Sequence, residues 1–360
     1  MMGYEQLMAE GYIYARKRTG YYVESLPSLK IMIPPKKIHM VHPVTESKPY
    51  LEFKTNVIAR DAFPYNLWEK CERQVIMDTL PEHINEKTLY GYMPLREEIA
   101  KYLYNYRAIE VTPADIIITS GTETLVPLIQ GLTPEHQCVG LENPGYPKLS
   151  RIYRSLRIPT MPIRLDGNGM AMDALGASHV SMIHITPSHQ FPTTEVMSVK
   201  KRMALLEWAN QCDNRWILED DYDSEFRFSG KPIPALRSLD HHGKVIYFNS
   251  FSKSIAPSIR ISFVVLPSSL RQKTRLHSSD YSCPVSMIQQ MTLSQFMADN
   301  HFERHLNRMR NVYKAKRDYL MTALMRLSFN DMFRIVGFDA GLHFLLVFHA
   351  MSETRLIASA

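Results

Sequence analysis

Short apolar runs rich in β-branched residues recur through the middle of the chain and alternate with longer amphipathic segments. The apolar runs predict strands over residues 115–119, 138–142, 180–186, 216–222, 245–249 and 259–266. The amphipathic segments predict helices over 66–78, 94–106, 122–130, 147–156 and 198–212. This alternation predicts a mostly parallel sheet flanked by helices, with ligands bound beyond the carboxyl ends of the strands.

The ends of the chain show other patterns. Residues 4–10 predict a helix and residues 12–24 a hairpin with its turn at 17–20. Residues 26–50 carry five prolines without a clear period, which predicts a linker between domains. From about residue 270 to 327 the pattern is helical, and residues 342–348 predict a last short strand.

Composition narrows the class of protein. The 360 residues, 45% hydrophobic and 22% charged, predict a globular protein of two domains or one large one. No run is apolar enough for a membrane helix, and the N-terminus lacks a secretory pattern, so we expect a cytoplasmic protein. The four scattered cysteines form no CxxC pair and the 14 histidines no HExxH, so we expect no metal site. A net charge of +6 permits an acidic partner such as DNA without demonstrating one.

Candidate chemistry first gathers after the strand at 245–249. Lys253 follows Ser250 and Ser252, and a lysine desolvated at a strand end can form an imine with an aldehyde. The planar guanidinium of Arg260 matches a phosphate, and the two serines add hydroxyl donors. Taken alone, this motif also fits an ordinary surface lysine beside a capped turn.

The strand at 216–222 ends in an acidic run. Alternation places Asp220 and Tyr222 on one face and Asp221 on the other. A carboxylate near a pyridine nitrogen keeps that nitrogen protonated and makes the ring an electron sink, and a tyrosine hydroxyl can bind a ring oxygen. Magnesium binding or simple solvation are the alternatives for this run.

Two further strand ends could contact the same ligand. Ser120, Gly121 and Thr122 precede a helix, and a glycine at a helix N-terminus is suited to cradle a phosphate. Tyr146 follows a turn after the strand at 138–142 and could stack on an aromatic ring. Each is also compatible with a plain turn, but together the strand ends supply a cradle, a stacking ring, an acid, a lysine and an arginine.

Five segments carry a family resemblance: TSGTETL, ENPGYP, TPSHQFPT, LEDDYDSEFR and FSKSIAPSIR. They resemble fold-type-I pyridoxal phosphate (PLP) enzymes and, more narrowly, MocR-type regulators, which join a GntR-type winged helix-turn-helix to an aminotransferase-like domain. The N-terminal EGYI and TGYYV segments are similar to the end of a winged helix with its wing. The resemblance implies a winged-helix remnant at 1–25, a linker at 26–50 and a PLP domain at 51–360. That domain would comprise a large domain over about 90–270 and a small domain from 51–90 and 271–360.

The resemblance also implies a role for each matching residue. Lys253 would hold PLP as an internal aldimine, Asp220 would bind the pyridine nitrogen, and Tyr222 the phenolic oxygen. The stacking and phosphate-binding roles would fall to Tyr146, Ser120, Gly121, Thr122, Ser250, Ser252 and Arg260. Lys148 would face the substrate, and Tyr90 or Tyr92 would reach the phosphate of a neighbouring subunit in a homodimer. Arg16, Lys17 and Arg18 in the wing remnant would contact DNA.

Some positions depart from the family pattern. Thr194 and Ser258 stand where glycine is usual, and Phe191 stands where related aminotransferases keep an asparagine over the ring. The comparison also leads us to expect a chain truncated at both ends, with an incomplete small domain. The recognition helix would lie before its start, and the arginine that binds the substrate carboxylate would lie beyond its end.

These patterns leave two functions open. The first is a PLP-binding transcriptional regulator that responds to an amino acid or amine and binds DNA as a full-length protein. The second is an active aminotransferase in which Lys253, once released, moves the α-proton of the substrate. A nucleotide-binding protein is disfavoured because neither GxGxxG nor GxxxxGK[ST] occurs.

Overall fold

The computed structural model describes residues 2–25, 57–133, 138–228, 234–277, 281–349 and 352–359. Contacts divide the chain into two units, Met1–Phe53 and Lys54–Ala360. The proposed linker at 26–50 lies outside the described residues. The division of the second unit into a large and a small domain stays a prediction.

The first unit is a helix followed by a hairpin. Helix α1 spans Met2–Ala9, and strands β1 (Ile13–Arg16) and β2 (Gly20–Val23) pair antiparallel. Tyr4 stacks on Tyr21 with ring centroids 4.9 Å apart, and the Arg16 guanidinium lies over the rings of Tyr14 and Tyr22. The predicted helix and hairpin are confirmed, and aromatic contacts hold this small unit together.

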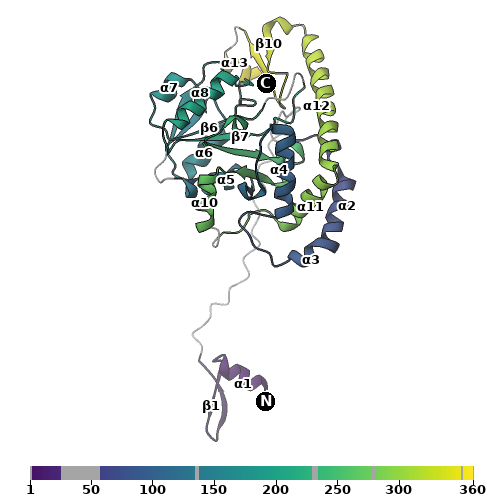
Figure 1. The fold of residues 1–360 in the computed structure, drawn as a ribbon. Coiled ribbons are helices and arrows are strands. Elements are labelled where there is room, and N and C mark those ends of the chain that lie inside the picture. Colours follow the sequence, from purple (N-terminus) through teal and green to yellow (C-terminus); the bar gives the residue numbers. More distant parts are fainter. Residues whose placement is uncertain are drawn as a thin grey trace. The chain divides into compact units, whose positions relative to one another are not determined.

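The second unit is built on a seven-stranded sheet (Figure 1) with the order β3-β9-β8-β7-β6-β4-β5. The strands are β3 (Ile116–Thr119), β4 (Val139–Asn143), β5 (Thr160–Arg164), β6 (Met182–Ile185), β7 (Trp216–Asp221), β8 (Val245–Ser250) and β9 (Ser262–Val265). The pairs from β5 through β8 are parallel, whereas β9 runs antiparallel to both of its neighbours. The predicted mostly parallel sheet is confirmed.

Helices cover both faces of this sheet. The helices of this unit are α2 (Tyr65–Gln74), α3 (Leu80–His83), α4 (Met93–Arg107), α5 (Thr122–Leu132), α6 (Pro147–Ser155), α7 (Met172–Gly176), α8 (Val199–Asn210), α9 (Phe251–Ser254), α10 (Ser268–His277), α11 (Met287–Ala298), α12 (His301–Met325) and α13 (Glu353–Ser359). On one face α2, α4 and α11 pack side by side (Figure 1), and the core of α7 and α8 lies on the same face. The opposite face is covered by α5, α6 and α10.

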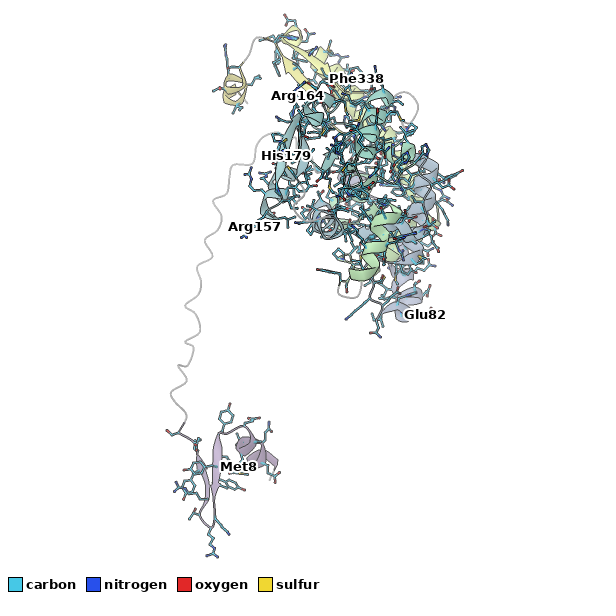
Figure 2. All side chains as sticks on the ribbon, turned by 60° about the vertical axis from the view of Figure 1, so that its left-hand side comes forward. Met8, Glu82, Arg157, Arg164, His179 and Phe338 are labelled. Carbon is cyan, nitrogen blue, oxygen red and sulfur yellow. The ribbon has the colours of Figure 1, made fainter. Side chains whose placement is uncertain are left out.

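Alternation along the strands separates these cores. In β7, Ile217 packs into the core with α8, whereas Leu218 packs into the core with α5 and α6. Apolar side chains therefore point to both faces, which explains the near-continuous apolar runs of the sequence. The edge strand β5 was not predicted from its sequence. Figure 2 shows Arg157, Arg164 and His179 along that margin of the unit.

The C-terminal part follows the long helix α12. Strands β10 (Phe333–Val336) and β11 (Leu345–Phe348) form an antiparallel pair, and β11 falls within the last predicted strand. The helical pattern predicted from about residue 270 resolves into α10, α11 and α12. No helix that the structure describes is long and apolar enough to cross a bilayer.

Candidate cofactor site

A cavity of about 530 Å³ lies at the carboxyl ends of the central parallel strands, beside the N-terminus of α5. Nearly every residue predicted for the cofactor or substrate lines it: Gly121, Thr122, Tyr146, Lys148, Asp220, Tyr222, Ser250, Ser252, Lys253 and Arg260. Ser120 does not line the cavity itself, but its carbonyl oxygen accepts a hydrogen bond from Arg260 Nη2 at 2.7 Å. The structure therefore brings together side chains that lie more than a hundred residues apart.

Lys253 sits in the first turn after β8. Ser250 begins this turn as the N-cap of α9, where its Oγ accepts a hydrogen bond from the backbone N–H of Ser252 at 3.2 Å. Burial lowers the pKa of Lys253, and the Asp223 carboxylate opposes that shift. A lysine in this setting loses its proton more easily than a solvated one, which suits a nucleophilic amine.

Asp220 and Tyr222 both face the cavity, while Asp221 points to the other side of the sheet, as the alternation predicts. Among the described residues no donor forms a hydrogen bond with the Asp220 carboxylate, and its Oδ1 is buried. His184 Nε2 lies 3.4 Å from Asp220 Oδ2. A buried carboxylate oxygen without a donor fits a site whose ligand brings an N–H group, as a protonated pyridine does.

Tyr222 is held by a polar cluster behind it. Its hydroxyl lies 3.2 Å from His189 Nδ1, and His189 Nδ1 lies 3.0 Å from Asp223 Oδ2. Burial and the Asp223 charge raise the pKa of Tyr222, so its phenol stays protonated. A protonated hydroxyl can donate to a ligand oxygen in the cavity.

The expected phosphate cradle lies at the start of α5. Gly121 has φ +86°, and a Cβ there would lie 2.7 Å from Arg260 Nη2, so this position requires glycine. Its own N–H already donates to Ser262 Oγ at 3.1 Å, which leaves later groups of the turn to bind an anion. Ser250 and Ser252 lie together, with their hydroxyl oxygens 2.8 Å apart.

An aromatic wall closes part of the cavity. Tyr146 meets Phe191 edge-on with ring centroids 5.4 Å apart, and Phe191 lies 5.1 Å from the ring of His343. Burial and the neighbouring His189 lower the pKa of His343 to about 4, so this ring is neutral at physiological pH. Thr194 adopts φ +68°, the left-handed region that explains why the family usually has glycine there.

Several predicted residues have other contacts. Lys148 forms an ion pair with Glu123. Tyr92 is buried in the core beneath α4, and the Tyr90 hydroxyl lies 2.9 Å from Thr274 Oγ1. Neither tyrosine lines the cavity. Their contact with a neighbouring subunit stays a prediction.

The sequence did not reveal Glu142, whose carboxylate also lines the cavity. It accepts hydrogen bonds from Thr186 Oγ1 at 2.8 Å and from the Thr186 N–H at 3.2 Å. Burial outweighs these bonds and raises the pKa of Glu142 to about 7. His184 was missed as well, because a histidine inside an apolar run resembles a packed core residue until its neighbour on the next strand is known.

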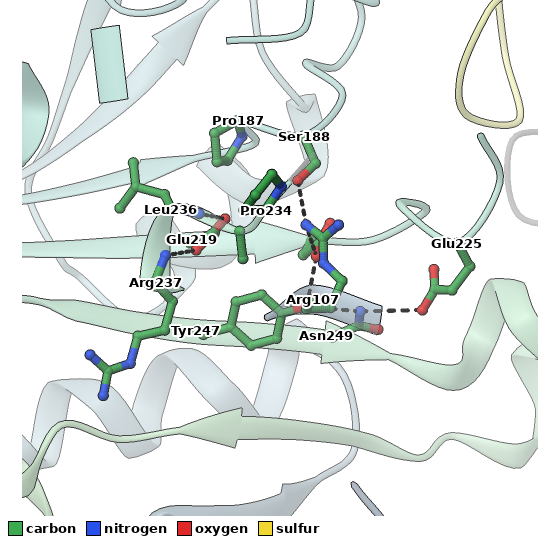
Figure 3. Close-up of polar contacts among 12 residues, drawn as sticks. Arg107, Pro187, Ser188, Glu219, Glu225, Pro234, Leu236, Arg237, Tyr247 and Asn249 are labelled. Atoms are coloured by element: carbon green, nitrogen blue, oxygen red, sulfur yellow. Dashed lines mark hydrogen bonds and ion pairs between the residues drawn. The ribbon is translucent and has the colours of Figure 1, made fainter. Parts of the chain in front are cut away.

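Behind the cavity, the other face of β7 carries a buried polar network (Figure 3). Arg107, at the end of α4, forms a 2.7 Å ion pair with Asp221 and donates to Ser188 Oγ at 2.8 Å. Tyr247 donates to the same aspartate at 2.6 Å. Glu219, two residues before Asp221 on β7, accepts hydrogen bonds from the backbone N–H groups of Leu236 and Arg237 at 2.8 Å each (Figure 3). This network anchors the strand end that presents Asp220 and Tyr222.

Two clusters of described residues have ligand types suited to a metal ion: Cys71, Asp299 and His301, and separately His189, Asp223 and His343. In the second cluster Asp223 already bonds His189 and also accepts the N–H of Leu342 at 3.0 Å. His189 and Asp223 of that cluster therefore position the Tyr222 hydroxyl.

Comparison with known proteins first defines the class of the fold. Residues 72–356 match the family model of class I and II aminotransferases. The kynurenine aminotransferase of Pyrococcus horikoshii is similar in structure, with a TM-score of 0.70 and 25% identity over 79% of this chain and 72% of that one. A multiple substrate aminotransferase from Thermococcus profundus gives a TM-score of 0.74 and 24% identity over 84% and 77%. The unit after Phe53 therefore has the fold of a class I and II aminotransferase.

The curated relatives narrow the family further. The chain is 34% identical to the uncharacterized HTH-type transcriptional regulator YdeL of Bacillus subtilis, over 99% of this chain and 77% of that protein. It is 28% identical to the probable rhizopine catabolism regulatory protein MocR of Rhizobium meliloti, over 98% and 74%. The chain belongs to the MocR-type transcriptional regulators, with an aminotransferase-like domain whose cofactor is PLP. The predicted family and cofactor are confirmed.

Proposed function

We propose that this chain senses its effector through PLP carried on the amine of Lys253. The observation that supports this most is the shared cavity, which is lined both by a half-buried lysine of lowered pKa and by an aspartate whose buried Oδ1 has no hydrogen-bond donor among the described residues. Bound PLP supplies an aldehyde and an electron-withdrawing ring that activates a bound amine. The residues of the chain position that group and control its protons.

Each cavity residue then has a defined task. Asp220 accepts the N–H of the pyridine ring, which satisfies its buried oxygen. Tyr222, held protonated by its surroundings, donates to the phenolic oxygen of the ring. Tyr146 covers one face of the ring. Arg260, Ser250 and Ser252, with the turn at Ser120, Gly121 and Thr122, bind the phosphate.

The effector is an amino acid or amine that reaches the same lysine. Binding would bias the orientation of the DNA-binding unit, because a ligand shifts a conformational equilibrium by its differential affinity for the two states. In the first unit the exposed Arg16, Lys17 and Arg18 at the hairpin tip suit contacts with DNA phosphates. Action as a homodimer in the cytoplasm completes this proposal.

Catalysis of transamination is the second candidate. The lowered pKa of Lys253 favours it, since a neutral amine freed from the cofactor can accept the α-proton of a bound amino acid. Conversion of an amino donor and an acceptor by the wild-type chain, with no conversion by Lys253→Ala, would support this function.

Visible absorbance during PLP titration tests the proposal. We expect an imine band in the wild type that borohydride traps, and no band in Lys253→Ala. Lys101→Ala is the matched control, because Lys101 pairs with Glu98 on α4 and does not line the cavity. A band of equal size in Lys253→Ala, or a folded wild type without a band, would contradict the assignment.

A further inference from the structure

Glu123 holds an unusual position for an acidic side chain in a phosphate-binding site. It is the second residue of α5, and its carboxylate pairs with two cations that line the same cavity. Glu123 Oε2 lies 3.1 Å from Arg260 Nη2, and the other oxygen pairs with Lys148. These cations hold the pKa of Glu123 at about 2 against the opposing effect of burial, so the carboxylate is ionised at physiological pH.

The carboxylate lies where an incoming phosphate needs its donors. A Cβ built on Gly121 would lie 2.9 Å from Glu123 Oε2 and 2.7 Å from Arg260 Nη2, so both groups crowd the glycine of the cradle. Arg260 is also tied to the Ser120 carbonyl at 2.7 Å. Because Glu123 and the Ser120 carbonyl both bind Arg260 Nη2, a phosphate that approaches this nitrogen competes with the Glu123 carboxylate for it.

We propose that Glu123 is an internal anion that competes with the phosphate of PLP for Arg260 and so lowers the affinity of this chain for PLP. The inference rests on the proposed function, in which Arg260 binds that phosphate. For a sensor the consequence is useful, because weaker binding leaves cofactor occupancy responsive to concentration.

Lys148 allows a phosphate to replace Glu123 at Arg260 without leaving the Glu123 carboxylate unpaired. When phosphate takes Arg260, the Glu123 carboxylate keeps Lys148 as its partner. All three side chains are between 41% and 49% exposed, so they can rearrange at the cavity mouth without disturbing the core. Lys148 thus acts through Glu123, in addition to any direct contact with a substrate.

The simpler role for Glu123 is to stabilise the N-terminus of α5 by its charge. The two roles differ in what they predict for a ligand without a phosphate. Loss of a helix-stabilising charge changes PLP and pyridoxal binding alike. Loss of a phosphate competitor changes PLP binding alone.

The test measures dissociation constants of PLP and of pyridoxal for the whole chain, by quenching of tryptophan fluorescence. In Glu123→Gln we expect PLP to bind about three- to tenfold more tightly, the size of one partly exposed charge interaction, and pyridoxal to bind as in the wild type. Inorganic phosphate alone should likewise bind this variant more tightly than the wild type. Glu98→Gln is the matched control, since Glu98 pairs with Lys101 on the surface of α4, outside the cavity.

A double-mutant cycle with Lys148→Met gives a second test, and the single Lys148→Met variant covers the case in which Glu123→Gln folds poorly. Lys148→Met should weaken PLP binding, because Glu123 then has Arg260 as its sole cation, and this loss should largely disappear in the Glu123→Gln background. Unchanged PLP affinity in Glu123→Gln, equal changes for PLP and pyridoxal, or an additive cycle would overturn the inference. Arg260→Ala distinguishes failure of the proposed phosphate site from failure of the role proposed for Glu123. If it leaves PLP affinity unchanged, the proposed phosphate site itself is wrong. If it weakens PLP while Glu123→Gln has no effect, the role of Glu123 alone fails.

Discussion

Replacing Arg107 by methionine should destabilise the second unit more than any surface change. Arg107 is 4% exposed, its Nη2 pairs with Asp221 at 2.7 Å, and it donates to Ser188 Oγ at 2.8 Å. Methionine fills much of the same volume but supplies no donor. Asp221, which is 1% exposed, would keep the 2.6 Å hydrogen bond from Tyr247 but lose its counter-charge.

Removal of one partner from a buried ion pair typically costs about 3–5 kcal/mol, because the remaining charge stays desolvated. We expect a loss in that range, a large share of the roughly 5–15 kcal/mol that stabilises most domains. Urea unfolding followed by tryptophan fluorescence measures it, and Trp216 in β7 reports from the affected strand. The midpoint should fall while the slope stays unchanged.

Two further variants make the measurement decisive. Arg73→Met is the control, because the Arg73–Glu69 pair is exposed and should contribute about 0.2–1 kcal/mol at most. Arg107→Met combined with Asp221→Leu should regain part of the stability, since no buried charge is left alone. A loss below about 1 kcal/mol in the single variant, or a double variant that is worse than the sum of the singles, would refute the reasoning.

Three other predictions follow from the cavity. Gly121→Ala places a Cβ against Arg260 at a φ of +86° and should weaken PLP binding by about tenfold or more without unfolding the chain, as PLP titration and thermal melting would show. Glu142 has its pKa raised from 4.5 to about 7, so it adds stability below pH 4.5 that is lost as the pH rises to 7. In Glu142→Gln, urea midpoints measured across this range should lack that decline. Asp223→Asn removes the charge that raises the pKa of Lys253, so the rate of imine formation should reach its plateau at lower pH than in the wild type.

The sequence predicted the strands of the sheet well because most are buried on both faces and read as continuous apolar runs. It missed β5, where Pro162 interrupts the pattern; a strand at the edge of the sheet tolerates the lost N–H donor. It also missed β10, a four-residue strand whose pairing with β11 depends on the fold of the segment between them. Strands of four residues are too short for their hydrophobic alternation to be recognised in the sequence.

For the cavity, the sequence predicted residues that follow strands within recognisable motifs, such as Lys253 and Asp220. It did not predict Glu142, His343 or Arg107, because their roles come from contacts with distant segments. Arg107 ends a helix and reads as a solvated cation there. Its burial becomes visible only when β7 and the turn at Ser188 are placed beside it.

In the acidic run of β7, contacts with other segments give different roles to carboxylates that the sequence alone does not distinguish. Glu219, Asp220 and Asp221 are consecutive carboxylates, and nothing in their order distinguishes a ligand from an anchor. The fold gives Glu219 two backbone N–H donors and gives Asp221 an arginine and a tyrosine. Among the described residues it gives Asp220 no hydrogen-bond donor. Because a desolvated carboxylate needs a donor, the one left without a donor is the one available to a ligand. A shift of one residue in the pairing of β7 would exchange these faces, so the anchors that fix its register also determine which acid faces the cavity.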